Sequence, residues 1–331
     1  MIPIKGYATF DPLKHCWIGS GFKTEWFSDL PIYKNKKIMD PLKKIADETE
    51  EDYCKLEKIL NDAGVKTHRS FLDINKVGSL KNIFRPPVNP RDHFAVIGEK
   101  IYAVTGGMAG YADVLKQIDR KNMYIDKDKA HISTAVICRV GKDLWWDIRK
   151  KTDDMVIQKF KNLWEQEGFR VHLSYRGYHS DGVFCVVKPG CIVSLYGIQK
   201  YDKEFPGYEI LYLPDQSWNK MSPFIEMKRK VGGRWWLKGE EHNEQLIEFV
   251  NTWLNEWVGF VEETVFDVNM LSLDQNNIIC NTYNKEVFDY FKKHKVEPIL
   301  FNFRHRYFWD GGVHCITQDL YREGTMEDYF G

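Results

Sequence analysis

The chain has 331 residues, enough for one large domain or two ordinary ones, and 47 Lys and Arg balance 47 Asp and Glu. This balance gives no electrostatic reason to expect nucleic acid or an anionic membrane as a partner, and 15% aromatic residues argue against disorder. No apolar run approaches the roughly 18 residues of a membrane span. Residues 1–21 lack a secretory pattern, and seven cysteines without a CxxC pair argue against a zinc site or a disulfide framework, so a cytoplasmic protein is expected.

Short apolar runs that are paired across a tight polar turn recur along the chain and predict β-hairpins. These pairs occupy residues 94–106, 135–148, 183–197 and 270–281, and a weaker fifth member begins within 10–21. Amphipathic stretches predict four helices, at 41–64, 152–168, 241–259 and 284–295, the second with Thr152 as its N-cap. Three of these helices lead into a further strand, at 65–71, 169–175 and 296–302.

A unit of hairpin, helix and strand therefore recurs about five times at irregular spacing. Such a unit cannot bury its own apolar face, so its copies are expected to pack against one another. No linker rich in Gly, Ser or Pro divides the chain. The sequence thus predicts one domain over residues 1–331 built from quasi-repeats, and the alternative is an ordinary α/β domain whose repeats are coincidental.

The cysteines differ in their positions relative to these elements. Buried thiols inside strands and helices are usually inert. The cysteines in such places are Cys16, Cys54, Cys138, Cys185, Cys191 and Cys280. Cys315 instead follows a Gly-Gly turn in GGVHC, where the backbone can approach a ligand and the thiol can face a cavity. Its position in the sequence alone favours neither a catalytic nucleophile nor an inert thiol at Cys315.

Three polar residues precede predicted hairpins. His179 and Asp181 are two positions apart, so in extended backbone both project to the same side, although an ordinary surface pair is the alternative. Asp92 precedes its hairpin much as Asp181 does. If the repeats surround a common axis, these three residues and Cys315 converge. Two carboxylates, a thiol and an imidazole suit a planar cation such as a guanidinium, which the carboxylates hold while the thiolate attacks its carbon.

The motifs resemble those of the glycine amidinotransferases, within the pentein superfamily of guanidine-modifying enzymes. The segment GGVHCITQD (311–319) is similar to the family's nucleophile segment, and NPRDHFAVIG (89–98) to its Pro-Arg-Asp segment. The segment YHSDGVFCVVKPGCIVS (178–194) resembles the His-x-Asp segment, and VNMLSLDQNNIICN (268–281) the stretch before the nucleophile. The motifs occur in the family's order, and FDPLKHCWIG fits its first strand.

The resemblance implies a five-bladed α/β propeller of ββαβ modules around a pseudo-fivefold axis, with the site in the central channel. If the roles of the family's motif residues apply here, Cys315 would be the nucleophile and His179 the general acid and base. Asp92 and Asp181 would bind the guanidinium. The implied reaction moves the amidino group of L-arginine to an amine acceptor through an amidino-cysteine intermediate. Glycine is the acceptor in the best-known members of the family. A hydrolase of the deiminase or dihydrolase type and a weakened guanidino-compound binder are the alternatives.

The resemblance also sets expectations about partners and about the thiol. No metal or organic cofactor is implied, the partners are small molecules, and a homodimer stays open. A bound guanidinium and His179 are expected to depress the pKa of Cys315.

The sequence departs from the family pattern at several positions. Ser133 stands where the family usually has an acidic residue that orients the histidine, and Ile198 where it has an arginine for the substrate carboxylate. Glu262 and Glu263 replace two small hydroxyl residues. The candidate replacement anchors for that carboxylate are Arg176, Lys200 and Arg304. Asp310, at the mouth of the Gly-Gly turn, has no assigned role.

Overall fold

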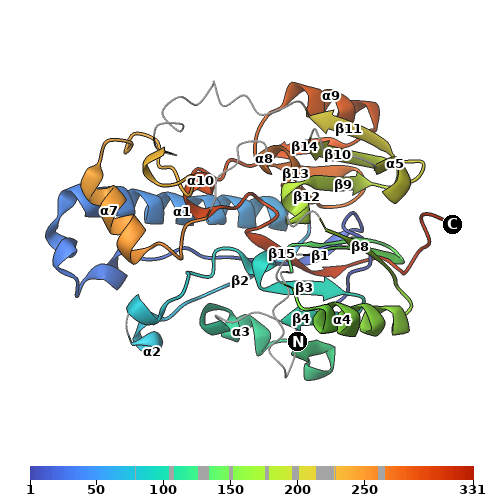
Figure 1. The fold of residues 1–331 in the computed structure, drawn as a ribbon, viewed down its shortest axis with the longest axis horizontal. Helices are drawn as coiled ribbons and strands as arrows, with labels where there is room; N and C mark the ends of the chain where they lie inside the picture. The colour runs from blue at the N-terminus through green and yellow to red at the C-terminus, as the bar shows by residue number, and fades with distance from the viewer. Residues whose placement is uncertain are drawn as a thin grey trace.

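The computed structural model describes residues 1–78, 80–103, 108–125, 134–148, 152–175, 179–195, 201–213, 227, 229–259 and 265–331. Within these residues the backbone forms five three-stranded sheets, each with an antiparallel pair and a parallel third strand (Figure 1). In order, the sheets are β15 (Thr317–Arg322), β1 (Leu13–Ile18) and β2 (Lys66–Arg69); β3 (Phe94–Ile97), β4 (Lys100–Ala103) and β5 (Met123–Ile125); β6 (Ile137–Val140), β7 (Asp143–Asp147) and β8 (Arg170–Ser174); β9 (Phe184–Lys188), β10 (Cys191–Leu195) and β11 (Glu209–Leu213); and β12 (Leu271–Ser272), β13 (Asn277–Cys280) and β14 (Glu297–Leu300).

The first sheet joins the two ends of the chain. β1 pairs antiparallel with β15, which places Cys16 opposite Asp319, and parallel with β2. The prediction that a local hairpin begins within 10–21 is therefore wrong, because the antiparallel partner of β1 comes from the other end of the sequence. The sequence pattern of a hairpin includes the short turn between its two strands, and no such turn connects β1 to β15. The other four predicted hairpins are confirmed.

Long helices connect the second and third strands of three sheets, as predicted. These are α1 (Lys36–Asp62), α4 (Asp154–Gln166) and α9 (Lys285–Lys293). α1 begins before Pro41, because the Asn35 side chain accepts a hydrogen bond from the Lys37 N–H and caps the helix there. α4 is capped by Asp153, which accepts from the Met155 N–H, and not by Thr152.

The remaining helices do not follow the repeat. α7 (Glu244–Trp253), capped by Asn243, lies between the fourth and fifth sheets in sequence and packs against α1 (Figure 1). The short α-helices are α2 (Ile74–Val77), α3 (Ala112–Leu115), α5 (Tyr201–Glu204), α8 (Val265–Val268) and α10 (Arg306–Trp309). The 3-10 helices are Thr24–Phe27, Pro31–Lys34, Leu80–Asn82, Pro90–Asp92, Met108–Tyr111, Arg120–Asn122 and Ser180–Gly182. The connection from β11, which ends at Leu213, to β12, which begins at Leu271, is the longest between successive sheets, and this makes the repeat spacing irregular.

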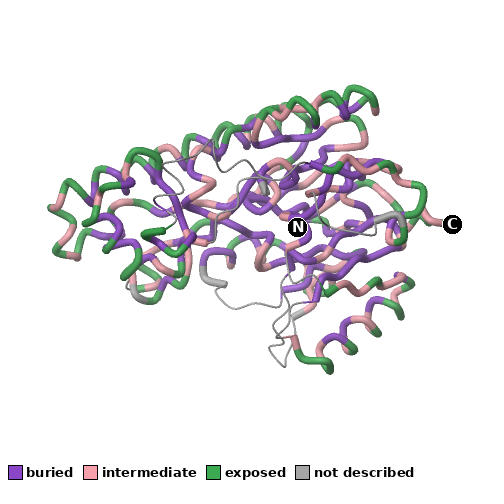
Figure 2. Tube along the Cα trace, turned by 45° about the horizontal axis from the view of Figure 1, so that its top comes forward, coloured by how far each residue is buried: buried purple, intermediate pink, exposed green. Residues whose placement is uncertain are grey.

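Each sheet contacts the next, and the fifth contacts the first. The contacts that join successive sheets are Trp17–Phe94, Val96–Arg139, Val187–Ser272 and Leu273–Leu13. Between the third and fourth sheets, Cys138 and Val186 belong to one hydrophobic cluster. Buried residues lie mainly along the strands in the interior of the fold. Exposed residues lie mainly along the outer helices (Figure 2). The fold is a five-bladed α/β propeller of small mixed sheets.

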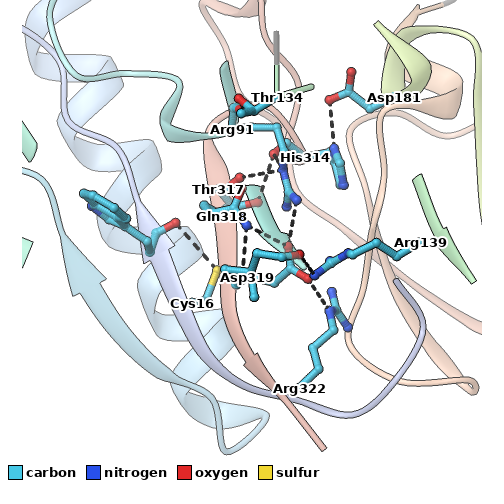
Figure 3. A network of polar contacts seen from close by, with 12 residues as sticks. Cys16, Arg91, Thr134, Arg139, Asp181, His314, Thr317, Gln318, Asp319 and Arg322 are labelled. Carbon is cyan, nitrogen blue, oxygen red and sulfur yellow. Dashed lines mark hydrogen bonds and ion pairs between the residues drawn. The ribbon is translucent and has the colours of Figure 1, made fainter. Parts of the chain in front are cut away.

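A buried ion network lies where these sheets meet (Figure 3). Asp319 on β15, 1% exposed, accepts hydrogen bonds from Arg91 at 2.7 Å, from Arg322 at 2.7 Å and from Arg139. Burial acts to raise the pKa of Asp319, but these guanidinium groups hold that pKa well below its usual range. Since Arg139 also bonds the Val96 carbonyl of the neighbouring sheet, the carboxylate ties several sheets together.

We expect Asp319→Asn to lower the free energy of unfolding by about 3–5 kcal/mol, because the arginines would be left with uncompensated buried charge. Urea denaturation at neutral pH measures this loss. Asp328→Asn is the matched control, since Asp328 pairs with Arg170 at the surface with 36% of its side chain exposed, and its loss should stay below about 1 kcal/mol. Equal losses in the two variants would contradict the role of the buried network.

Candidate active site

The predicted site residues lie just before the first strands of three sheets. Asp92 ends the 3-10 helix that precedes β3, Asp181 lies in the one that precedes β9, and Cys315 stands two residues before β15. Equivalent ends of the first strands converge because the sheets form a ring. The Cys315 thiol lies 3.3 Å from Asp181 Oδ2, and His179 Nδ1 lies 3.9 Å from Asp92 Oδ1. The structure thus brings together the four residues predicted from the sequence.

Asn269 fixes the position of the nucleophile turn. Its Nδ2 donates to Cys315 Sγ at 3.0 Å and to the Asp181 carbonyl at 3.2 Å. Its Oδ1 accepts from the backbone N–H groups of His314 at 3.0 Å and Cys315 at 3.3 Å. Asn269 precedes β12, the first strand of the fifth sheet, so the rule that selected Asp92 and Asp181 also points to it. Asn269 was not predicted from the sequence, because a neutral amide gives no charge signal.

The two glycines before Cys315 are required by close packing. A Cβ at Gly312 would lie 2.6 Å from Asn269 Oδ1 and 2.7 Å from Asn281 Nδ2. A Cβ at Gly311 would lie 2.9 Å from Asn89 Oδ1. The absence of side chains therefore lets buried amides approach the turn that carries the thiol.

Asp181 links the thiol to a second histidine. Asp181 Oδ2, which accepts from Cys315, lies 2.8 Å from His314 Nδ1 (Figure 3). Burial acts to raise the pKa of Asp181, but the bond to His314 and the positive groups around it hold the value at about 2. Burial lowers the pKa of His314. Asp181 therefore carries its negative charge directly beside the thiol.

The protein's own groups keep Cys315 protonated. Cys315 is 6% exposed, and burial together with Asp181 and Asp92 raises its pKa well above the usual range. The expected depression of this pKa is therefore not produced by the protein alone, and a thiolate at this position needs a positive charge from outside the chain.

Asp92 lies in a mixed environment of charges and amides. Arg85 Nη1 lies 3.8 Å from Asp92 Oδ2, and Asn89 Nδ2 donates to the same oxygen at 3.5 Å. Asp92 Oδ1 is buried and has no hydrogen bond within the described residues. Asp181 Oδ1 shares this property. The site therefore presents an open acceptor atom on each of the two carboxylates, which is the arrangement that N–H donors of a cation satisfy.

Asp310, to which the sequence assigns no role, lies within electrostatic range of the same charged groups. Burial and the Asp92 and Asp181 carboxylates raise its pKa to about 6, although Arg85 and His179 act in the opposite direction. Its backbone lies in the left-handed region, with φ of 52°.

The other sequence candidates lie elsewhere or outside the described residues. Arg304 donates to Asp52 at 2.9 Å and to Glu51 at 2.7 Å, so its guanidinium is committed to α1. The candidates that fall outside the described residues are Ser133, Arg176, Ile198, Lys200, Glu262 and Glu263. In the described part of the chain, no group of three or more His, Cys, Asp or Glu side chains could hold a metal ion, and no helix is long and apolar enough to cross a membrane.

Comparisons with known proteins point to one family, although no protein-family model matches the chain. Glycine amidinotransferase from Xenopus tropicalis is 22% identical over 200 residues, 59% of this chain and 40% of that protein. L-arginine:L-lysine amidinotransferase from Pseudomonas savastanoi pv. phaseolicola is 21% identical over 217 residues, 63% of this chain and 49% of that protein. The matched segments thus span less than half of these relatives.

A solved structure shares the fold over almost the whole chain. An amidinotransferase of the saxitoxin biosynthetic pathway from Microseira wollei superposes with a TM-score of 0.70 at 18% identity and covers 99% of this chain and 100% of that chain. The chain therefore shares distant sequence similarity with amidinotransferases, and it shares the fold of a solved amidinotransferase over almost its whole length.

Proposed function

We propose that this protein transfers the amidino group of L-arginine to an amine, with glycine as the first acceptor to examine, through an amidino-Cys315 intermediate. The observation that carries the proposal is the thiol of Cys315 beside two carboxylates, Asp92 and Asp181, each with a buried oxygen open to N–H donors. Distant sequence similarity to two amidinotransferases favours transfer to an amine over hydrolysis.

Binding of the guanidinium starts the proposed reaction. Its N–H groups donate to Asp92 Oδ1 and Asp181 Oδ1, which are buried and otherwise without a hydrogen bond in the described chain. The positive charge then offsets the carboxylates that raise the pKa of Cys315, so the thiol ionises only when the substrate is in place.

Transfer then proceeds in two balanced steps. The thiolate forms a bond to the guanidinium carbon, the bond to the ornithine nitrogen breaks, and His179 passes the proton released by the thiol to that nitrogen. In the second step an amine forms a new C–N bond, the C–S bond breaks, and the proton lost by the amine returns to Cys315. Asn269 positions the sulfur for attack, since its Nδ2 donates to Cys315 Sγ at 3.0 Å.

Intact-protein mass spectrometry after incubation with L-arginine tests the proposal. We expect an amidino adduct on Cys315, with one ornithine released for each adduct formed, and the adduct should disappear when an amine is added. Citrulline and ammonia without an added amine would instead identify a hydrolase. If L-arginine leaves neither an adduct nor a product with any amine supplied, the proposed function is wrong.

A further inference from the structure

We infer that His314 is a positioning residue for the nucleophile of this site. Through one hydrogen bond it holds the Asp181 carboxylate so that Oδ2 faces the Cys315 thiol while Oδ1 stays open for the guanidinium. The inference rests on the proposed function and adds to it a second histidine, which acts through Asp181.

The two oxygens of the Asp181 carboxylate have separate tasks. Oδ2 lies 3.3 Å from Cys315 Sγ, whereas Oδ1 is buried and has no hydrogen bond within the described residues. A cavity of about 30 Å³ lies beside the carboxylate and is also lined by Cys138, Ser180 and His314. The carboxylate therefore has room to turn away from the thiol unless a hydrogen-bond donor holds it.

His314 supplies that donor. Its Nδ1 lies 2.8 Å from Asp181 Oδ2, the same oxygen that accepts from the Cys315 thiol (Figure 3). With a pKa of about 2, Asp181 is ionised at neutral pH and can only accept, so Nδ1 of His314 carries the proton. Burial lowers the pKa of His314, which keeps the ring neutral. The contact is therefore a hydrogen bond from an imidazole to a carboxylate, and it resists rotation of that carboxylate.

The backbone of His314 is itself fixed on both sides. Its N–H donates to Asn269 Oδ1 at 3.0 Å, and its carbonyl accepts from Arg91 Nε at 3.3 Å. Arg91 also donates to Asp319 at 2.7 Å, which connects this turn to the buried ion network. A side chain whose own position is locked by such bonds can hold a functional group in place. His314 therefore ties Asp181 to the rigid interior of the ring.

The same hydrogen bond reduces the negative charge that acts on the thiol. Apart from burial, Asp181 is the strongest cause of the raised pKa of Cys315. A donor on Asp181 Oδ2 offsets part of the charge on that oxygen, so the thiol ionises more readily than it would beside an unpaired carboxylate. Removal of the imidazole should therefore make Cys315 harder to ionise.

Alkylation of Cys315 by iodoacetamide at pH 8 without substrate tests this role, with mass spectrometry of the peptide that contains Cys315 as the readout. We expect His314→Leu to slow the labelling about three- to tenfold, because the thiolate fraction falls when the thiol pKa rises. Asp181 stays ionised in this variant, since its pKa of about 2 lies far below pH 8.

Two amide variants test where the donor must stand. His314→Asn should restore the labelling rate to within about twofold of the wild type, because an asparagine Nδ2 can occupy the position of the imidazole Nδ1. His314→Gln should not restore it, because its amide reaches the position of Nε2 instead. This pair decides the question even if His314→Leu does not fold, and equal labelling rates in the two variants would overturn the inference.

His172→Leu is the matched control. It removes an imidazole whose Nε2 lies 2.6 Å from Asp143 Oδ1, a histidine–aspartate pair on β7 and β8 away from the thiol. The control should leave the labelling of Cys315 unchanged. Faster labelling in His314→Leu would indicate a loosened turn and not a lost hydrogen bond, and it would rule out the positioning role.

A double-mutant cycle tests whether His314 acts through Asp181. In Asp181→Asn protein, His314→Leu should have no further effect on the labelling rate, because the charge that the imidazole offsets is already gone. If His314→Leu slows labelling by the same factor in both backgrounds, the histidine acts on the thiol by another route and the inference is wrong.

Turnover separates this inference from the proposed function. With L-arginine and an amine, His314→Leu should lower kcat/KM for L-arginine about ten- to hundredfold, and His314→Asn should recover most of the loss. No ornithine from wild-type protein with any amine would defeat the proposed function, while the labelling series would still decide the role of His314. Normal turnover in the wild type together with unchanged labelling in every His314 variant would defeat that role alone.

Discussion

Cys315→Ala will abolish ornithine release, by roughly 10⁵-fold or more, since the covalent route is lost together with the nucleophile. The expectation rests on the site, where Cys315 is the thiol that contacts Asp181 at 3.3 Å and Asn269 at 3.0 Å. Turnover with L-arginine and the amine that best clears the adduct measures the effect.

Cys138→Ala provides the matched control. Cys138 is buried on β6 and lines the pocket behind Asp181, and burial raises its pKa to about 12. Its replacement removes a thiol of similar burial without touching the nucleophile turn, so turnover should remain near that of the wild type. Ornithine release that survives in Cys315→Ala would show that another group attacks the guanidinium, and the amidino-Cys315 intermediate would have to be abandoned.

Asp181→Asn will slow turnover of L-arginine and speed alkylation of Cys315. These opposite changes distinguish the proposed role of Asp181 from a general loss of structure. It should lower kcat/KM for L-arginine by roughly 10²–10³-fold, because a charged acceptor for the guanidinium becomes a neutral amide. It should also speed alkylation of Cys315 by iodoacetamide at pH 8 without substrate. Apart from burial, Asp181 is the strongest cause of the raised Cys315 pKa, so removing its charge lowers that pKa and increases the thiolate fraction.

Two comparisons sharpen this experiment. Asp92→Asn should weaken donor binding in the same way but accelerate alkylation less, since Asp92 raises the Cys315 pKa less than Asp181 does. Asp143→Asn neutralises a carboxylate that is 1% exposed on β7 and pairs with Arg170 and His172. If this control accelerates alkylation as much as Asp181→Asn, the faster labelling reports a loosened fold and not a change in thiol pKa.

The placement of six of the seven cysteines in strands or helices could be predicted from local sequence. Six of them lie in elements that apolar alternation or helical periodicity predicts, and all of these placements agree with the structure. Four hairpins and three of the crossover helices were predictable for the same reason, because their signals come from turns and periodic side chains that are close together in the sequence.

The convergence of Asp92, His179 and Asp181 on Cys315 was predictable only in outline. It follows from quasi-repeats that form a ring, but the ring closes through the pairing of β1 with β15, which no local signal reveals. Ser133 and Ile198, which depart from the family pattern, and Lys200, a candidate anchor for the substrate carboxylate, lie outside the described residues, so their roles stay predictions.

The candidate segments for the chemistry could be predicted from the amino-acid sequence alone, because Gly-Gly turns, His-x-Asp pairs and hairpins are formed by neighbouring residues. The surroundings of the thiol follow from the tertiary structure alone: the hydrogen bond from Asn269, the His314–Asp181 pair, and Arg85 beside Asp92. These groups come from different sheets and loops, and the burial that sets their charges exists only once the ring has closed. The raised pKa of Cys315 is therefore a property of the packed site. The direction of this pKa shift could not be predicted from the residues of the nucleophile turn alone.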